Sequence, residues 1–281
     1  MTGVSDKALD GRGFGGLTPF VVGFDLVARH FRAKKPHILV ACMPKSGSTF
    51  LTNALASHAG LKRCALLPTY GDREQELCEL KLTRYNGRGY VAQQHVRNSA
   101  WTQELARRYG LTVVVLVRDL FDCVVSIRDH IRKEADFGAL IRLTPRHLDL
   151  PDPELDDLIV QLAMPWYVSF YAGWRRDPNA LFVHYEDLAA DPASALETIL
   201  ARAGAETSPA AIRAALDRCA LQGNRFNRGV SGRGRTLRPE TRRRLLDMMA
   251  LYPEFADDPL FRPAPAPALV VDRTRPAASA G

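Results

Sequence analysis

The sequence contains few of the features that mark disulfide-stabilised or metal-binding proteins. Its 281 residues include only five cysteines, an odd number without a CxxC pair, and no histidine cluster has metal-ligand spacing. Disulfide frameworks and zinc sites require such patterns. We therefore expect reduced thiols, no metal site and a cytoplasmic location.

Long apolar segments are also missing. No stretch approaches the roughly 20 apolar residues that cross a bilayer, and residues 1–7 lack a basic segment leading into an apolar core. The sequence predicts neither stable membrane insertion nor secretion by a signal peptide.

The usual motif for ATP and GTP is absent as well. The pattern GxxxxGK[ST] does not occur, and Lys45 precedes Gly47 instead of following a glycine-rich coil. The strongest strand candidate ends in Arg118, where a Walker B motif would place an aspartate for magnesium. Side chains would then neutralise bound phosphates without a required metal.

Charge is unevenly distributed. The net charge is +7, and the segment from Arg218 to Arg244 holds nine arginines against one acidic residue, Glu240. This excess suits an anionic ligand, a nucleic acid or an acidic surface, and a solvated basic face is the simplest alternative. Only Phe226 interrupts these arginines with an aromatic ring, which counts against a stacking platform for nucleic acid.

Composition divides the chain into three parts. Residues 1–20 are rich in glycine and predict a flexible N-terminus, whereas residues 262–281 form a proline- and alanine-rich tail that we expect to be disordered. Between them, residues 21–261 predict a single domain with one sizeable core.

Strand-like and helix-like patterns alternate through this domain. We expect one strand to begin at about residue 37 and others at 63–67, 90–95, 111–117 and 180–184. We expect one helix to follow the first strand and to end at residue 59, and others at 20–31, 101–109, 120–131, 155–174, 192–203, 209–217 and 239–251. Residues 135–153 predict a loop or lid. The alternation predicts an α/β fold of three layers, with a mostly parallel central sheet covered by helices on both faces.

The stretch from Ile38 to Leu51 predicts a strand, a tight polar loop and the start of a helix. The hydroxyls of Ser46, Ser48 and Thr49 are suited to cap this helix, whose first N–H groups have no intrahelical partner. A helix N-terminus attracts anions, and Lys45 adds a full positive charge. Taken alone, such a turn is equally consistent with a simple cap.

A second anion-binding candidate follows the apolar strand 111–117. Arg118 ends this strand, and Ser126 lies eight residues later on the next helix. A guanidinium and a hydroxyl together can bind a phosphate. The alternative is that Arg118 pairs with Asp122 and that Ser126 faces solvent.

These segments resemble the sulfotransferases that use 3′-phosphoadenosine 5′-phosphosulfate (PAPS), and the resemblance extends over roughly residues 37–245. The family loop P-[KR]-[ST]-G-[ST]-[TS]-aromatic-L matches residues 44–51. The family's Arg and Ser, eight residues apart, match Arg118 and Ser126, and its YEDL segment matches residues 185–188. The resemblance implies a P-loop-containing nucleotide-binding fold.

The resemblance also assigns the cofactor-binding residues. The 5′-phosphosulfate would be held by Lys45, Ser46, Gly47, Ser48 and Thr49, adenine would contact Phe50 and Tyr185, and the 3′-phosphate would be held by Arg118, Ser126, Arg228 and Gly229. Arg228 and Gly229 belong to a segment similar to the family's RKGxxG loop, in which Asn227 replaces the first basic residue and Gly232 is retained. The cofactor would be PAPS, with adenosine 3′,5′-bisphosphate (PAP) as its product and no metal required.

For the catalytic base, the resemblance implies His95. It occupies the position of the histidine in the family's KTH segment, although Gln93 stands where the family has lysine. A neutral imidazole suits proton abstraction near neutral pH. A structural role for His95 stays an alternative, with His130, His147 and His184 as weaker rivals.

The resulting hypothesis is in-line transfer of a sulfuryl group to the hydroxyl of a small molecule, glycan or lipid, with Lys45 stabilising the leaving group. The acceptor pocket is expected in residues 64–90 and 135–153, with polar candidates Tyr70, Lys81, Tyr85 and His147. A magnesium-dependent P-loop kinase using ATP ranks second, and a basic nucleic-acid-binding protein third. The sequence does not indicate an oligomeric state.

Overall fold

The sheet confirms the predicted α/β class. The computed structural model describes residues 28, 30–68, 75–134, 141–221 and 231–261. Within them, five strands form one sheet in the order β2-β3-β1-β4-β5, and every neighbouring pair is parallel. The strands are β1 (His37–Cys42), β2 (Lys62–Cys64), β3 (Tyr90–Gln94), β4 (Leu111–Val117) and β5 (Leu181–His184).

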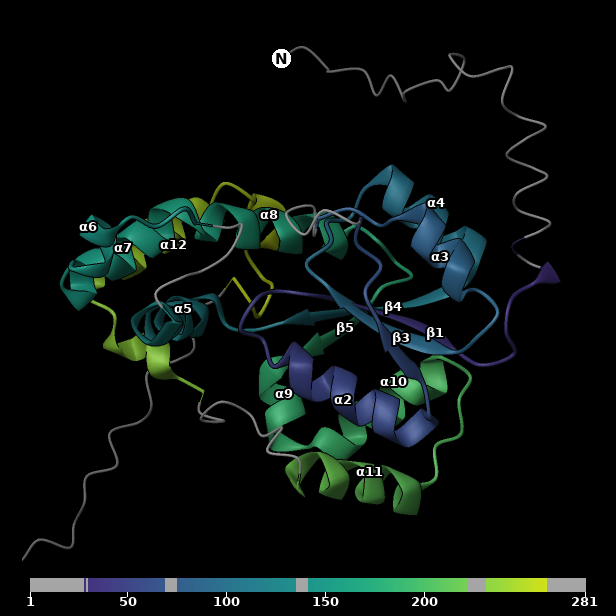
Figure 1. Cartoon of the computed structure of the whole chain (residues 1–281). Helices are drawn as coiled ribbons and strands as arrows, with labels where there is room; N and C mark the ends of the chain where they lie inside the picture. Colours follow the sequence, from purple (N-terminus) through teal and green to yellow (C-terminus); the bar gives the residue numbers. More distant parts are fainter. Residues whose placement is uncertain (1–27, 29, 69–74, 135–140, 222–230, 262–281) are drawn as a thin grey trace, which may run out of the picture.

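Helices cover both faces of this sheet (Figure 1). The α-helices are α2 (Ser48–Ala59), α3 (Glu79–Tyr85), α4 (Ala100–Tyr109), α5 (Leu120–Glu134), α6 (Pro145–Leu148), α7 (Asp152–Leu162), α8 (Met164–Arg175), α9 (Tyr185–Ala190), α10 (Pro192–Arg202), α11 (Pro209–Leu221) and α12 (Pro239–Met249). Two short 3₁₀ helices, η2 (Arg233–Thr236) and η3 (Pro253–Phe255), flank α12.

The central strand β1 is buried on both faces because its alternate residues enter different cores. Leu39 and Ala41 belong to a cluster that includes residues of α4, α5, α7 and α8. Ile38 and Val40 belong to a second cluster, with residues of α2, α10 and α11. This arrangement explains the continuous apolar sequence of β1 and β4, which is expected where helices cover both faces of a parallel sheet.

Several predicted boundaries are confirmed. Strand β4 spans the predicted residues 111–117, and α2 and α4 end at glycines in the left-handed conformation, with φ of 60° at Gly60 and 61° at Gly110. Strand β2 is shorter than expected. It occupies residues 62–64, whereas we predicted 63–67.

One helical prediction was wrong, and a segment predicted as a loop or lid contains helices. The single helix expected at 155–174 is two helices, α7 and α8, and Pro165 is the second residue of α8. Proline lacks an N–H donor and its ring clashes with the preceding turn, so it starts a helix more readily than it bends one. The segment predicted as a loop at 135–153 contains α6 and the first residues of α7.

Two further helices occur where the sequence has no sustained apolar period. Helix α3 lies within the segment 64–90 that we expected to be loop-like, and α9 contains the YEDL residues. The predicted tails, and most of the helix expected at 20–31, lie outside the described residues, so the domain limits 21–261 stay a prediction. Within the described residues, no helix has both the length and the apolar character needed to cross a membrane.

Candidate functional site

The two predicted anion-binding segments meet at the carboxyl edge of the sheet. Strands β1 and β4 are neighbours, with Cys42 opposite Leu116. The chain leaves β1 toward β2 on one side and leaves β4 toward β5 on the other, and α2 and α5 then pack on opposite faces. Ligands of open α/β sheets bind at such a switch point.

The loop after β1 holds its backbone in a conformation that presents N–H groups to an anion. Lys45 has φ of 65° and Gly47 has φ of 82°, and successive N–H groups in alternating right- and left-handed conformations form an anion-binding concavity. Gly47 is the N-cap residue of α2, and as a glycine it has no side chain with which to cap the helix.

This geometry corrects the predicted role of the hydroxyls. Ser46 is buried, and its Oγ donates to the carbonyl of Met43 over 2.6 Å. This hydrogen bond stabilises the loop from within. Ser48 is also buried, whereas Thr49 is exposed at the start of α2. A capping oxygen would have competed with a bound anion for the same amides.

Side chains from other elements hold the strained residue Lys45 in place. A left-handed conformation costs a residue with a side chain about 1–2 kcal/mol. The Nη1 of Arg118 donates to the Lys45 carbonyl over 2.9 Å, and the hydroxyl of Tyr167 in α8 donates to the Pro44 carbonyl over 3.0 Å. Burial lowers the pKa of the Lys45 ammonium, and the nearby charges of Lys133 and Arg118 lower it further.

Arg118 is buried at the end of β4, with only 5% of its surface exposed. Its guanidinium lies 4.2 Å above the ring of Tyr185, the first residue of α9. Tyr185 therefore contacts Arg118. That Tyr185 also contacts adenine stays a prediction. Ser126 is buried two turns along α5, which contradicts the alternative in which it faces solvent.

Asp122 is a part of the site that sequence patterns did not reveal. The sequence alone offers it as an ion-pair partner of Arg118, and the two side chains do lie 3.8 Å apart. However, the carboxylate of Asp122 also accepts hydrogen bonds from the backbone N–H groups of Gly232 and Gly234, over 2.8 and 2.7 Å. The amide of Gly232 is thus directed at a carboxylate, not left open for a phosphate.

His95 follows β3, which lies beside β1 at the same edge of the sheet. Its Nδ1 is 2.8 Å from the carbonyl oxygen of Cys42. Because a carbonyl only accepts hydrogen bonds, Nδ1 carries the hydrogen and Nε2 holds the lone pair. The ring meets Trp166 of α8 edge to face, with 6.4 Å between centroids. A half-buried imidazole fixed in this tautomer can accept a proton at Nε2.

Other predicted residues fall elsewhere. Arg228, Gly229 and Tyr70 lie outside the described residues, and Phe50 is half-buried near the start of α2. Tyr85 packs against Tyr90, the first residue of β3, with 6.1 Å between their ring centroids. Tyr85 therefore lies near the amino end of β3, whereas His95 follows its carboxyl end.

His147 has a structural role in its own helix. Its Nδ1 accepts a hydrogen bond from the backbone N–H of Thr144 over 3.2 Å and completes a capping box at α6. This contact makes His147 a weak candidate for the catalytic base and for a residue that binds the sulfate acceptor.

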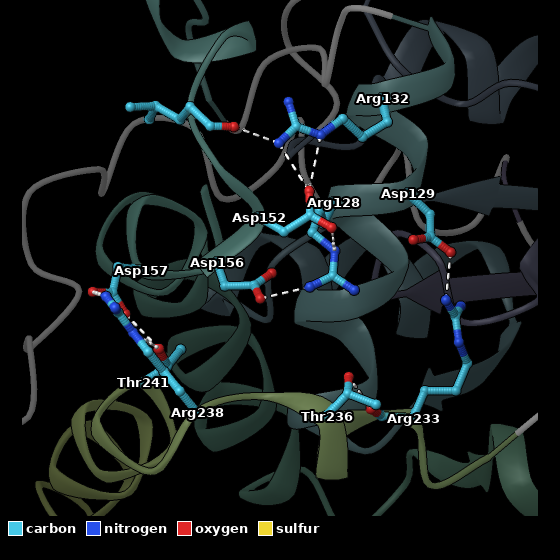
Figure 2. Close-up of polar contacts among 11 residues, drawn as sticks. Arg128, Asp129, Arg132, Asp152, Asp156, Asp157, Arg233, Thr236, Arg238 and Thr241 are labelled. Atoms are coloured by element: carbon cyan, nitrogen blue, oxygen red, sulfur yellow. Dashed lines mark hydrogen bonds and ion pairs between the residues drawn. The ribbon is translucent and has the colours of Figure 1, made fainter. Parts of the chain in front are cut away.

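Three of the C-terminal arginines, Arg233, Arg238 and Arg244, are paired with carboxylates (Figure 2 shows the first two), whereas Arg235 and Arg243 are exposed, as expected of a solvated basic face. Asp157 of α7 bonds to Arg238 and also to Arg244 and Thr241, over 2.6 and 2.5 Å. Arg233 pairs with Asp129 of α5. These pairs neutralise part of the basic charge on which the nucleic-acid alternative depended. Within the described residues, no group of three His, Cys, Asp or Glu side chains is arranged to hold a metal ion.

The fold is that of a P-loop-like α/β protein, and the two predicted anion-binding segments lie at its switch point. The family model described as the sulfotransferase domain matches residues 35–231. This match covers more than half of the chain, and the protein belongs to the sulfotransferase domain family.

Two solved structures have a similar fold. Mouse sulfotransferase SULT7A1, complexed with PAP, is 15% identical, and the match covers 85% of this chain and 91% of the mouse chain with a TM-score of 0.58. Retinol dehydratase, in complex with androsterone and the inactive cofactor PAP, is 16% identical, with 85% of each chain covered and a TM-score of 0.53. No curated protein matches the chain.

Asp119, next to this site, makes the stability of the folded protein depend on pH. Its side chain accepts the N–H of Asp122 over 2.8 Å at the start of α5, while its own N–H donates to Glu186 over 3.1 Å. Burial raises the pKa of Asp119 from 3.8 to about 6, and the charges of Asp122 and Glu186 act in the same direction. Between these two pKa values the folded protein retains a proton that the unfolded chain has released, so stability falls as pH rises through this window.

We predict that Asp119→Asn removes this pH dependence. The asparagine amide oxygen can still accept a hydrogen bond from the Asp122 N–H. Unlike the Asp119 carboxyl, however, the amide does not ionise as pH rises. Relative to the variant, the wild-type protein should lose about 2–3 kcal/mol of unfolding free energy between about pH 4 and about pH 7. Urea denaturation at a series of pH values measures this difference, and parallel curves for the two proteins would contradict the prediction.

Proposed function

We propose that this sulfotransferase moves a sulfuryl group from PAPS to an acceptor hydroxyl by in-line displacement. The observation that carries the proposal is that the two predicted anion-binding segments lie at adjacent strand ends, joined by the bond from Arg118 to the Lys45 carbonyl. A simple triphosphate needs one such segment. A nucleotide with phosphates on both its 3′ and 5′ positions needs two.

The residues fit this cofactor in two groups. The left-handed loop at Lys45, Ser46 and Gly47, together with Ser48 and Thr49, would hold the 5′-phosphosulfate on backbone N–H groups and on the Lys45 ammonium. Arg118 and Ser126 would hold the 3′-phosphate, with Arg228 and Gly229 closing over it. Phe50 and Tyr185 would contact adenine.

Proton removal and charge stabilisation are assigned to two side chains. His95 would take the acceptor's proton at Nε2, because its Nδ1–H is held by the Cys42 carbonyl. PAPS supplies the sulfuryl group, whose bond to the phosphate oxygen breaks as its bond to the acceptor oxygen forms. Lys45 would stabilise the negative charge left on that phosphate oxygen. Such chemistry depends mainly on positioning and needs no metal.

The acceptor is a hydroxyl compound, either a small molecule or part of a glycan or lipid. We propose the cytoplasm as the site of reaction, and the proposal is supported by the five cysteines, which are all free thiols and include three buried ones, Cys42, Cys123 and Cys219.

Ligand-induced stabilisation tests the cofactor. In the presence of a metal chelator, PAP at 100 times its dissociation constant should stabilise the folded protein by about 2.7 kcal/mol and raise its melting temperature. ATP under the same conditions should have little effect, because it lacks the 3′-phosphate. Stabilisation by ATP that requires magnesium, with no response to PAP, would instead support a kinase.

We expect Lys45→Ala to reduce turnover by about 10²–10³-fold while changing PAP affinity much less. The matched control is Lys45→Gly, which removes the same amine but suits the left-handed backbone. Both variants should be equally inactive, with the glycine variant the more stable of the two. Wild-type turnover in either variant would remove Lys45 from the mechanism.

For His95→Ala, turnover with a saturating acceptor should fall by about 10²–10⁴-fold. The decline in wild-type rate at acidic pH, caused by protonation of the imidazole, should be absent from the residual activity of the variant. His147→Ala serves as a control, because His147 caps its own helix. Full turnover in His95→Ala would show that another group is the base.

A further inference from the structure

Asp122 holds a distant part of the chain against α5. Its side chain is 1% exposed, and its two carboxylate oxygens accept the N–H groups of Gly232 and Gly234. Hydrogen bonds to an ionised carboxylate are stronger than neutral ones, and a buried carboxylate without such bonds would be costly. These two bonds therefore fix the backbone that begins at Ser231.

Close packing makes the same contact specific. A Cβ atom added to Gly234 would lie 2.3 Å from the Cβ of Phe121, so only glycine fits there. On the other side, Arg242 lies 4.5 Å above the Phe121 ring and donates to the Gly234 carbonyl over 2.9 Å. Arg233 adds its ion pair to Asp129 (Figure 2). The segment 231–236 is thus docked on α5 by charge and by shape.

The same carboxylate faces the proposed 3′-phosphate ligands. Asp122 lies one helical turn before Ser126 and four residues after Arg118. The distance of 3.8 Å between Arg118 Nη2 and Asp122 Oδ2 is an ion-pair distance, longer than a hydrogen bond. Asp122 can therefore orient the guanidinium by charge, while its own lone pairs are directed at the two glycine amides.

We infer that Asp122 is a positioning residue for recognition of the 3′-phosphate. It sets the orientation of Arg118 on one side and anchors the segment beginning at Ser231 on the other, so that both are in place before a nucleotide arrives. The inference rests on the proposed function, because it concerns the same nucleotide site. Its consequence is selective: loss of Asp122 impairs binding of nucleotides with a 3′-phosphate more than binding of nucleotides without one.

The test compares Asp122→Asn with Asp157→Asn. Asp157 is also a buried carboxylate held by arginines, but it joins α7 to α12 and has no contact with Arg118 or Ser126 among its described bonds. Dissociation constants are measured by calorimetry for PAP and for adenosine 5′-phosphate, which differ only in the 3′-phosphate. The ratio of the two constants reports recognition of that phosphate, independently of a general loss of stability.

We expect the wild-type protein to prefer PAP, Asp122→Asn to reduce this preference by about tenfold or more, and Asp157→Asn to retain it. Gly234→Ala, which displaces the same segment without removing a charge, should reduce the preference as well. Should Asp122→Asn and Gly234→Ala bind both nucleotides with the wild-type ratio, Asp122 is only structural and the inference is wrong. A wild-type protein without any preference for PAP contradicts the proposed function itself, and the inference with it.

Discussion

Arg118 connects the parts of the molecule on which the site depends. From the end of β4, its guanidinium reaches the carbonyl of Lys45, the ring of Tyr185 and the carboxylate of Asp122. These groups belong to the loop after β1, to α9 and to α5. Because guanidinium is planar and always charged, it can bond along its edge while its face lies on a ring. One buried cation therefore determines how three segments meet.

The site combines a strained loop with a rigid frame. Lys45 adopts a backbone conformation that its side chain disfavours, and buried strands lie directly before the loop. Tyr167 in α8 and Arg118 at the end of β4 donate hydrogen bonds to the carbonyls of this loop. These contacts offset the free energy that the left-handed backbone of Lys45 costs. In the proposed function, the Lys45 ammonium and this loop would need little rearrangement to receive the phosphosulfate.

Local patterns predicted the parts of this structure that local chemistry determines. The β-branched run at 111–117 and the glycine at residue 110 set the limits of β4, and the parallel sheet followed from alternation of elements. The role of Asp122 could not be predicted in this way, because its partners lie 110 and 112 residues further along the chain. The hydroxyl of Ser46 illustrates a related limit, since the sequence does not reveal that it donates to the carbonyl of Met43.

The contact between Asp122 and the two glycines also bears on the order in which the protein is made. Synthesis proceeds from the N-terminus at roughly 5–20 residues per second, so Gly234 leaves the ribosome several seconds after Asp122. During that interval the carboxylate of Asp122 lacks both of its backbone donors. The support that we infer for the 3′-phosphate site therefore cannot form until synthesis has passed Gly234, in the last quarter of the chain.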